Sequence, residues 1–533
     1  MRFLPVNLNA LLVELDDLPQ TLALLGALQA DPVPGVQELL PAARTVLVTY
    51  DSHTVSRAAL TARIAACDIH THTERPGELV EIPVRYSGED LAEVAQMLGL
   101  SPDEVIQRHT ASLYTAAFVG FAPGFAYLSG GDAVFDVPRR KTPRTHVPAG
   151  AVALASTFCG VYPKVSPGGW QIIGQTDVPM WDLAREVPAL VQPGSRVRFV
   201  EQGASPALPR PQAAAAVHPE PKGPTKIPAQ GPALVVRQTG LLALFQDLGR
   251  PGQAGQGVSA SGAMDRAALR AANRLVGNPP GAACIELAYG GFEVESRGDT
   301  VVALTGADVP LTLISAAGPR WPLSSHAPLA LADGDRLQVG PPRAGMRSYL
   351  ALRGGFAVEP VLGSCGTDVL AGIGPAPLAV GDVLGVGALA QGVVGAAGSP
   401  VADLPAAGDT VTLDVVLGPR TDWLVPQAVE LLRAQAWQVT PQSNRVGLRL
   451  QGNTPLAHAT PRELPSEGTS CGAIQVPPSG QPVLFLADHP MTGGYPVIGA
   501  VAPYHLDLAG QIPVGAFVRF HPVSVFDPVE TAS

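Results

Sequence analysis

The sequence contains one dense motif towards its C-terminal end, Ala487-Asp488-His489-Pro490-Met491-Thr492-Gly493-Gly494-Tyr495-Pro496-Val497-Ile498-Gly499. An apolar run over residues 482–487 precedes it and predicts a buried strand, and a second apolar run follows the Gly-Gly pair. The turn therefore brings an acid, an imidazole, a hydroxyl and a phenol to the end of a strand. We expect a functional site at this turn.

The same pattern occurs once more, much earlier in the chain, as Gly168-Gly169-Trp170-Gln171-Ile172-Ile173-Gly174. The agreement extends upstream, where residues 150–154 match 472–476, and downstream, where residues 197–199 match 518–520. Three elements in the same order at similar spacing predict a repeated module. Because two copies do not make a solenoid, we interpret them as two related domains whose Gly-Gly turns face one another.

Composition narrows the class of protein. A chain of 533 residues is too long for one hydrophobic core, so we expect two to four domains. Charged residues make up only 15%, while 58 Gly and 54 Pro indicate many tight turns between short strands. The net charge of −10 gives no reason to expect nucleic acid or an anionic membrane as partner. We expect a small-molecule ligand or another protein instead.

The five cysteines are odd in number and lack paired spacing, so they support neither a disulfide framework nor a metal site. This favours a reducing, cytoplasmic location. Residues 1–30 are apolar, but Glu14, Asp16 and Asp17 interrupt the core that a signal peptide requires. The uncharged run over residues 383–402 is rich in Gly and Ala, which favours loop and strand over a membrane helix.

The first half begins with a small α/β domain, residues 1–80, with strands at 8–15 and 44–50 and helices at 17–30 and 54–66; residues 80–86 are candidates for a further strand of it. Ser101, Pro102 and Glu104 supply a cap, a first-turn proline and a capping-box acid for a helix over 102–112. Short apolar runs follow, with room for a helix only around 180–185. Residues 81–201 therefore predict a β-barrel or sandwich.

A Pro- and Ala-rich segment, residues 202–232, predicts a linker. Beyond it we expect one domain over 233–420, with a helix at 265–276, and a second over 421–533. The latter has a helix at 421–436 and the repeated barrel over roughly 440–522. Two glycine-led strand entries, residues 333–337 and 381–384, hint at a third barrel. The fold class is mainly β with α/β parts.

Ordered motifs occur in both halves of the chain. Those of the first half are Gly120-Phe121-Ala122-Pro123-Gly124-Phe125-Ala126-Tyr127-Leu128, Val147-Pro148-Ala149-Gly150 and Val161-Tyr162-Pro163 through Trp170. Those of the second half are Gln246-Asp247-Leu248-Gly249-Arg250, Ser261-Gly262-Ala263-Met264-Asp265, Tyr349-Leu350-Ala351-Leu352-Arg353-Gly354-Gly355, Ser466-Glu467-Gly468 and Thr492-Gly493-Gly494-Tyr495-Pro496. By these motifs the first half resembles the B subunit of the bacterial ATP-dependent 5-oxoprolinase, a family also described as allophanate hydrolase subunit 1 or as a histidine-kinase inhibitor. The second half resembles the C subunit of that enzyme, or allophanate hydrolase subunit 2.

The resemblance implies a fusion of two usually separate subunits, with cyclophilin-like barrels in both halves and an active cleft between them. It implies ATP with Mg²⁺, and the A subunit of 5-oxoprolinase as a separate partner, and it leaves a homodimer open. The same modules resemble the carboxyltransferase region of urea amidolyase, to which a biotinylated carrier delivers the carboxyl group. Biotin is expected only under that reading.

This chain also departs from the family pattern. The family usually has Arg where this chain has Gln171 and Gln175, and an Arg-Ser-Thr sequence in place of Cys365-Gly366-Thr367. Ala376-Pro377 replaces another Arg-containing turn, and Pro490-Met491 stands where polar residues are common. Because Arg binds carboxylates bidentately, its loss points to altered substrate anchoring.

Opening a lactam with water requires an activated carbonyl, a base and donors for the oxyanion. We select Asp488, His489 and Glu467 as catalytic candidates. The structural alternative for Asp488 is a surface turn in which its carboxylate binds backbone amides, and for Glu467 it is an exposed loop acid without a role. Cys471 lacks an evident activating neighbour, and His109 at a helix end suits packing. The candidates for binding substrate or an anion are Arg139, Arg144, Tyr162, Gly168, Gly169, Trp170, Gln475, Thr492, Gly493, Gly494 and Tyr495.

These binding candidates have structural alternatives as well. The run Arg139, Arg140, Lys141 and Arg144 is also typical of a solvated loop, the Gly-Gly pairs permit tight turns, and the aromatics suit packing. No phosphate-binding Gly-x-x-x-x-Gly-Lys loop occurs, so a nucleotide would bind by another route, shared with a partner protein.

The leading functional hypothesis is ATP-dependent hydrolysis of a cyclic amide, 5-oxoproline to glutamate, together with the A subunit. A carboxyltransferase component is the second hypothesis, although the chain has no Met-Lys-Met carrier motif. A histidine-kinase-binding regulator is the third, and recovery of a kinase without hydrolysis would favour it.

Overall fold

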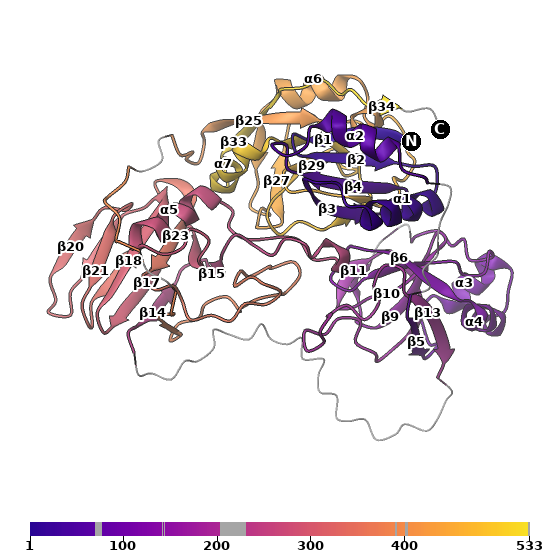
Figure 1. Cartoon of the computed structure of the whole chain (residues 1–533), viewed down its shortest axis with the longest axis horizontal. Helices are drawn as coiled ribbons and strands as arrows, with labels where there is room; N and C mark the ends of the chain where they lie inside the picture. The colour runs from indigo at the N-terminus through magenta and orange to yellow at the C-terminus, as the bar shows by residue number, and fades with distance from the viewer. Residues whose placement is uncertain are drawn as a thin grey trace.

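The computed structural model describes residues 1–69, 77–140, 142, 144–202, 231–389, 392–399 and 403–530. Within them the fold is mainly β, with a seven-stranded barrel in each half and a small N-terminal α/β part, as expected. Figure 1 shows the N-terminal sheet beside the C-terminal barrel, the first barrel below them, and a two-sheet body at the far end of the molecule. The predicted linker lies outside the described residues over 203–230.

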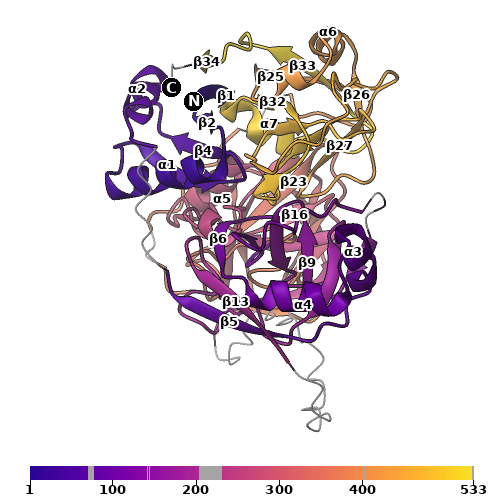
Figure 2. The same ribbon diagram turned by 90° about the vertical axis from the view of Figure 1, so that its right-hand side faces the viewer.

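The N-terminal sheet has the strand order β3-β4-β2-β1-β34, with helices α1 and α2 on one face. The prediction of one strand over residues 8–15 is wrong at its start, because the chain turns at Leu8 and Asn9 between two paired strands. Figure 2 shows β34, near the C-terminus, beside β1. The elements are β1 Arg2–Asn7, β2 Ala10–Glu14, α1 Leu18–Ala30, β3 Val36–Pro41, β4 Thr45–Tyr50, α2 Arg57–Ala65 and β34 Val529–Glu530.

Both faces of this sheet are buried. Val13 and Val46 pack under α1 and α2, whereas Leu12 and Leu47 on the opposite face form a second cluster with Met491. A sheet buried on both sides requires continuous apolar strands, as residues 10–13 are. The N-terminal sheet is therefore a layer between its own helices and the second half of the chain.

The first barrel has the order β12-β9-β10-β7-β6-β13-β5, and a bridge between Arg85 and Gln175 nearly closes it. Helix α4 begins with the predicted capping box of Ser101 and Glu104. The elements are β5 Leu79–Val84, α3 Leu91–Leu98, α4 Pro102–Ala111, β6 Tyr114–Val119, β7 Ala126–Ser129, β9 Ala151–Ala155, β10 Phe158–Val161, β12 Gln171–Gln175 and β13 Arg196–Glu201.

Two predictions for this region are wrong. Strand β5 does not extend the N-terminal sheet, because it pairs in parallel with β13 over its whole length. Residues 180–185 form turns instead of a helix, since Trp181 bridges Ala189 and the Asp182 N–H donates to the Pro188 carbonyl at 3.0 Å.

The second half begins with a six-stranded and a five-stranded sheet that share one apolar core. No third barrel is found in the described part of the chain, because the strands after the two glycine-led entries, β22 and β24, both lie in the six-stranded sheet. The elements are β14 Ala233–Thr239, β15 Leu242–Gln246, α5 Arg266–Val276, β16 Cys284–Ala288, β17 Phe292–Arg297, β18 Thr300–Asp308, β19 Leu311–Ile314, β20 Arg320–Leu323, β21 Pro328–Leu331, β22 Arg336–Val339, β23 Ala344–Leu352 and β24 Val383–Gly385.

The C-terminal barrel is closed in the order β25-β32-β29-β30-β27-β26-β33. It begins at β25, some way before the predicted start near residue 440, because β25 pairs in parallel with β33. The predicted helix over 421–436 is a short 3-10 helix, η2, followed by α6 after Pro426. The elements are β25 Thr410–Leu417, η2 Thr421–Trp423, α6 Gln427–Ala434, β26 Trp437–Val439, β27 Gly447–Gln451, β29 Ala473–Gln475, β30 Val483–Phe485, β32 Val497–Val501, η3 Pro503–His505, α7 Leu506–Gln511 and β33 Phe517–Pro522.

The two barrels correspond strand by strand. Written in spatial order, β12-β9-β10-β7-β6-β13-β5 matches β32-β29-β30-β27-β26-β33-β25, and each barrel has its parallel pair in the same place. Each also carries a two-stranded ribbon beside its Gly-Gly turn: β8 (Arg144–Val147) with β11 (Ser166–Gly168), and β28 (Glu467–Gly468) with β31 (Thr492–Gly493). The predicted repeat is therefore confirmed.

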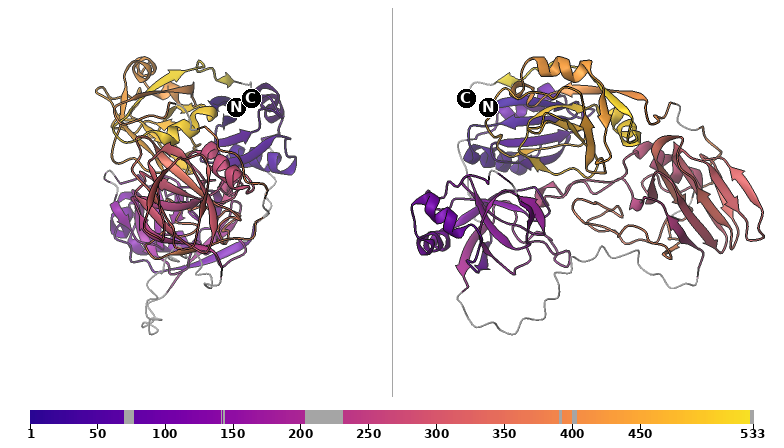
Figure 3. Two further views of the ribbon diagram at one scale, coloured as in Figure 1. Left: turned by 90° about the vertical axis from the view of Figure 1, so that its left-hand side faces the viewer. Right: turned by 180° about the vertical axis from the view of Figure 1, so that it is seen from behind.

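Two loops of the two-sheet body reach across to the first half, as Figures 1 and 3 show. The first, residues 250–262, is called the strap here; it contains η1 (Ala254–Gln256). The Ala254 N–H donates to Glu38 at 3.2 Å, and the Gly124 N–H donates to the Gln256 carbonyl at 3.0 Å. In the second loop, the Leu370 carbonyl accepts from Lys164. The two halves therefore share contacts besides the linker.

Candidate active site between the two barrels

A cavity of about 820 Å³ lies between the two barrels, and we call it the inter-barrel cavity. Both Gly-Gly turns line it, one from each barrel, as the sequence repeat predicts. The predicted site residues that line it are Arg139, Tyr162, Gly168, Gly169 and Trp170 from the first barrel and Thr492, Gly493, Gly494 and Tyr495 from the second. Residues distant in the sequence thus form one concave surface.

The two halves touch at the edge of this cavity. The Phe121 N–H donates to the Thr492 hydroxyl at 3.0 Å, and a Cβ placed on Gly494 would lie 3.8 Å from Nη1 of Arg139. Gly120 has no room for a side chain, because its Cβ would lie 2.4 Å from the Thr492 hydroxyl. The first-half segment around Gly120 is therefore fitted directly against the second Gly-Gly turn.

Aromatic rings form the first-barrel wall. The Phe125 ring lies edge-on to Tyr127, Tyr162 and Trp170, with centroid distances of 5.1, 5.2 and 5.3 Å. Edge-to-face contacts of this kind hold rings in fixed orientations. Burial raises the pKa of Tyr162 to about 12, so its phenol stays protonated and can act as a donor. This wall suits a small ring with a polar edge.

Three charged or titratable residues of the opposite wall were missed in the sequence analysis: His458, Arg462 and Glu463. They lie in the loop between β27 and β28, which has no periodic pattern. His458 Nε2 lies 3.2 Å from the Pro477 carbonyl, which leaves Nδ1 as the ring's acceptor. Among the described residues, no ion pair involves Arg139, Arg462 or Glu463, so these charges remain available to a ligand.

Asp488 does not line the inter-barrel cavity. Its carboxylate is fully buried and accepts two hydrogen bonds from Arg445, both at 2.9 Å, and one from Ser261. Arg445 also pairs with Glu286 on β16. This cluster joins the C-terminal barrel to the strap and the two-sheet body. The geometry therefore makes Asp488 an interdomain anchor, with its oxygens already engaged.

Glu467 is also turned away from the cavity, although its neighbour Ser466 lines it. The carboxylate accepts from Arg420 Nε at 2.9 and 3.0 Å, and the same guanidinium reaches Glu14 at 2.7 Å. Burial raises the pKa of Glu467, while the Arg420 partner opposes this rise. This residue thus ties the ribbon of the C-terminal barrel to the N-terminal sheet.

His489 lies on a different cavity, described below. Its Nδ1 is 2.9 Å from the Pro490 carbonyl, and burial lowers its pKa, which favours the neutral ring. The structure therefore keeps all three catalytic candidates out of the lining of the inter-barrel cavity, although the Glu467 backbone pairs directly with Gly493 of the second Gly-Gly turn.

Two further binding candidates lie outside the inter-barrel cavity. Arg144 is paired with Asp90 at 2.7 Å and Glu89 at 3.2 Å, so its charge is neutralised. Gln475 supports the second Gly-Gly turn from behind, where its Nε2 would be 2.6 Å from a Cβ on Gly493. Lys141 of the basic run lies outside the described residues.

Three of the residues that depart from the family pattern, Gln171, Gln175 and Met491, have local explanations. Gln171 and Gln175 donate to the carbonyls of Pro138 and Ala149, and neither lines the inter-barrel cavity. Met491 is 6% exposed because it packs into the second face of the N-terminal sheet. An apolar residue therefore suits this position.

Within the described part of the chain, no group of three or more His, Cys, Asp or Glu side chains is arranged to hold a metal ion. No helix there is long and apolar enough to cross a membrane.

Two family models match the chain. The model described as carboxyltransferase domain, subdomain C and D, matches residues 1–191, and that for subdomain A and B matches residues 256–522. The chain belongs to the carboxyltransferase-domain family. The order of the two matches agrees with a fusion of a half like the B subunit of 5-oxoprolinase and a half like its C subunit.

Individual relatives support the same division of the chain into a B-subunit-like half and a C-subunit-like half. The C subunit of the 5-oxoprolinase of Escherichia coli (strain K12) is 38% identical over 298 residues, covering 54% of this chain and 90% of the relative. The B subunit of the 5-oxoprolinase of Bacillus subtilis (strain 168) is 37% identical over 190 residues, covering 32% of this chain and 78% of the relative. The resemblance inferred from the motifs is therefore confirmed.

Two other relatives extend the comparison. The urea amidolyase of Lachancea kluyveri is 32% identical over 315 residues, which cover 55% of this chain but only 17% of that protein. The solved structure of TTHA0988 is 36% identical, covers 96% of this chain and 99% of its own, and superposes with a TM-score of 0.81. The arrangement of both halves in one chain thus has a counterpart among solved structures.

Proposed function

We propose that this chain is the fused B–C component of an ATP-dependent 5-oxoprolinase, which opens the cyclic amide 5-oxoproline to glutamate together with a partner like the A subunit of that enzyme. The relatives named as its B and C subunits support this. The observation that carries it is the inter-barrel cavity, because each half supplies one wall and one Gly-Gly turn. A site divided in this way needs both modules together.

The substrate is a five-membered ring with a carboxylate, a lactam N–H and a lactam carbonyl. In the proposed complex, the guanidiniums of Arg139 and Arg462, which have no ion pair among the described residues, hold the carboxylate, since Arg binds carboxylates bidentately. The aromatic wall packs against the ring and excludes water from its face. These contacts fix the lactam carbonyl near the second Gly-Gly turn.

Hydrolysis adds water across the C–N bond: oxygen joins the carbonyl carbon and a proton goes to the leaving nitrogen. Glu463 or the free Nδ1 of His458 would take a proton from the attacking water, because these are the acid and imidazole that line the cavity. The backbone N–H of Gly494 would hold the developing oxyanion. When bound, ATP would supply the activation by transferring its γ-phosphoryl group to the lactam oxygen, with ADP as the leaving group.

The test is glutamate formation from 5-oxoproline and ATP, with the purified chain alone and with a protein like the A subunit. The proposal predicts turnover in the reconstituted mixture that depends on both proteins and on ATP. Absence of glutamate from a complex that assembles, as judged by gel filtration, would contradict it.

A second candidate is a carboxyltransferase component. Both family models carry that description, and the match to the urea amidolyase relative covers 55% of the chain. This function would require a biotin carboxylase and a biotinylated carrier in trans. Transfer of labelled bicarbonate to urea in their presence, without glutamate formation in the first assay, would favour this candidate.

A further inference from the structure

A second cavity, of about 530 Å³, lies where the N-terminal sheet, the start of helix α5 and the C-terminal barrel meet. We call it the α5 cavity. Asn7 and Thr49 line it from the sheet, and Arg266 and Arg270 from the helix. It shares no lining residue with the inter-barrel cavity.

One segment separates the two cavities. His489 and Met491 line the α5 cavity, and from Thr492 onward the same segment lines the inter-barrel cavity. The motif that stands out in the sequence therefore forms the wall between two sites, with its imidazole on one side and its Gly-Gly turn on the other.

The helix supplies two guanidiniums to the α5 cavity. Arg266 and Arg270 are four residues apart on α5, so they project from the same face of the helix. Within the described residues, neither guanidinium has an ion pair or hydrogen bond. Both side chains thus carry positive charge that nothing in this part of the chain neutralises.

The acids around this cavity are engaged with backbone groups. Asp507 accepts from the N–H groups of Arg266 and Ala267 at 2.9 and 3.1 Å, which caps the start of α5. Glu38 accepts from the Ala254 N–H at 3.2 Å, and burial raises the pKa of this carboxyl. Neither carboxylate is paired with the two guanidiniums.

The barrel side of the cavity holds unused hydrogen-bonding groups. His489 is 8% exposed, and its Nδ1 is taken by the Pro490 carbonyl, so Nε2 remains as an acceptor without a partner among the described residues. The Ser470 hydroxyl is buried and has no partner there either. Buried polar groups are normally satisfied, so the Ser470 hydroxyl points to a ligand or water.

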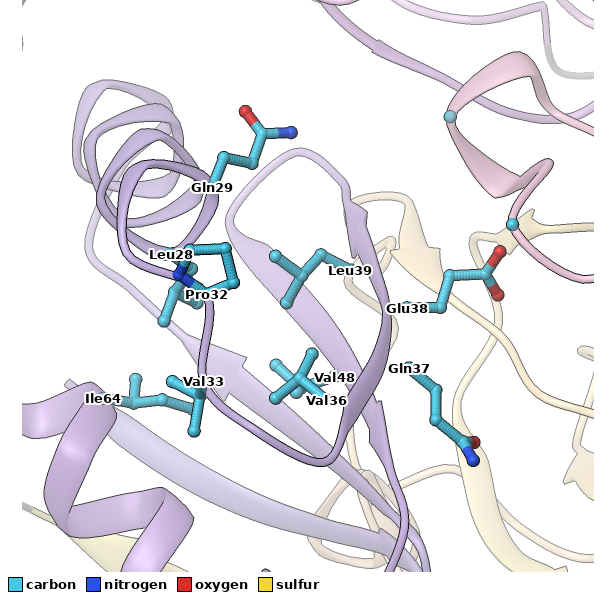
Figure 4. Close-up of a pocket in the computed structure, with 12 residues that line it drawn as sticks. Leu28, Gln29, Pro32, Val33, Val36, Gln37, Glu38, Leu39, Val48 and Ile64 are labelled. Carbon is cyan, nitrogen blue, oxygen red and sulfur yellow. The ribbon is translucent and has the colours of Figure 1, made fainter.

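A neighbouring hollow is lined mainly by apolar side chains, with Gln29, Gln37 and Glu38 as its polar ones. It measures about 400 Å³, and Val33, Val36 and Ile64 are among the apolar side chains around it (Figure 4). Glu38 projects away from them (Figure 4). The guanidiniums, the imidazole and the free hydroxyl are concentrated in the α5 cavity instead.

We propose that the α5 cavity binds a small ligand that carries an oxyanion, phosphate or carboxylate, together with an N–H or O–H donor. Arg266 and Arg270 hold the anion, Ser470 donates to it, and His489 Nε2 accepts from the ligand's donor. The binding chemistry stands on these residues alone; the choice of probes rests on the proposed function. ATP has the required groups in its phosphates and ribose hydroxyls. 5-Oxoproline has them in its carboxylate and lactam N–H.

The test uses the full chain and calorimetric titration with ATP, inorganic tripolyphosphate and 5-oxoproline. We expect the Arg266→Ala, Arg270→Ala double variant to weaken binding at this cavity at least tenfold. Arg274→Ala is the matched control, since it lies on the same helix but does not line the cavity, and it should bind as the unmodified chain does. Binding by ATP and tripolyphosphate identifies a phosphate site, and binding by 5-oxoproline alone a carboxylate site.

Two further measurements locate the ligand. Cys471 lines the same cavity, so the bound probe should slow its alkylation by iodoacetamide at pH 9, read by peptide mass spectrometry. His489→Leu, which removes the acceptor, should weaken ATP or 5-oxoproline more than tripolyphosphate, because only the first two carry a hydroxyl or a lactam N–H to donate to Nε2. If no probe protects Cys471, or if the double variant binds normally, the proposal is overturned. Loss of hydrolysis with retained binding would count only against the proposed function.

Discussion

The Phe121 N–H donates a hydrogen bond to the Thr492 hydroxyl at 3.0 Å, and this bond fixes the first half against the second Gly-Gly turn. Phe121 has a φ of 66°, a left-handed conformation that non-glycine residues rarely adopt. Because the next residue back is Gly120, the Thr492 side chain can approach the backbone closely. The inter-barrel cavity depends on this junction.

Gly120→Ala should disrupt the junction. Its Cβ would lie 2.4 Å from the Thr492 hydroxyl and 2.6 Å from its methyl group, so one segment must move. We expect a loss of about 1–3 kcal/mol in the free energy of unfolding, as for other overpacked sites. Under the proposed function, KM for 5-oxoproline should also rise, because the junction shapes the inter-barrel cavity. Urea denaturation and steady-state kinetics measure the two effects.

Gly26→Ala provides the control for that substitution. Gly26 lies in α1, with no atom within 4 Å of an added Cβ. Alanine there should stabilise the helix by up to about 1 kcal/mol and leave KM unchanged. An equal effect of both substitutions would show that the Thr492 contact is not what matters.

Asp488→Asn should act on stability. The substitution leaves the buried Arg445 without its bidentate carboxylate, and breaking such a pair costs roughly 3–5 kcal/mol. Thermal unfolding of the purified variant checks this. A normal midpoint combined with a large fall in kcat would instead make Asp488 a catalytic residue.

Under the proposed function, Arg139→Ala should raise KM for 5-oxoproline by about 10–100-fold, the loss expected for a hydrogen bond to a charged group. Arg198→Ala is the matched control, because Arg198 lies on β13 in an exposed pair with Glu81 at 3.5 Å. Initial-rate kinetics distinguish the two variants. Similar KM values would remove Arg139 from the substrate site.

Glu463→Gln and Glu467→Gln should differ in kind. If Glu463 is the base, its variant keeps normal stability but loses about 10²–10⁴-fold in kcat. Glu467→Gln removes the partner of Arg420, so unfolding at lower denaturant is expected. Measuring kcat and the urea midpoint for each variant separates these outcomes, and the reverse pattern would restore Glu467 as the catalytic acid.

His109 should make the first barrel acid-sensitive. Burial lowers its pKa to about 3, so the unfolded chain binds a proton below about pH 6.5 that the folded chain does not. The contribution of neutral His109 to the free energy of unfolding is therefore fully present above pH 6.5. It falls by about 1.4 kcal/mol per pH unit towards pH 3.

Hydrogen exchange of β13 amides at pH 7, 5 and 4, corrected for the intrinsic rate, measures this loss. His109→Phe should flatten the pH dependence, although it costs about 1–3 kcal/mol at neutral pH by leaving the Tyr86 hydroxyl without the ring nitrogen 2.7 Å away. An unchanged pH profile in the variant would assign the sensitivity to other groups.

The local sequence was sufficient for elements with strong end signals. Helix α4 has the capping box of Ser101 and Glu104, and α5 has Asp265 at its start and Gly277 at its end. Helix α3 was missed, because it has only eight residues and its Asp90 side chain binds Arg140 and Arg144 instead of capping the helix. Capping and periodicity are local properties, so a helix that lacks them cannot be predicted from its own sequence.

The repeat, its order and the division into two halves were determined by the sequence alone, because each barrel carries its own copy of the same strand and turn pattern. Only the tertiary structure decided the partners of the charged groups. Asp488 and Glu467 are paired with Arg445 and Arg420, while Glu463 and His458 enter the inter-barrel cavity from an irregular loop. Ion pairs and cavity walls join residues that are distant along the chain, and no local spacing encodes which of them will meet.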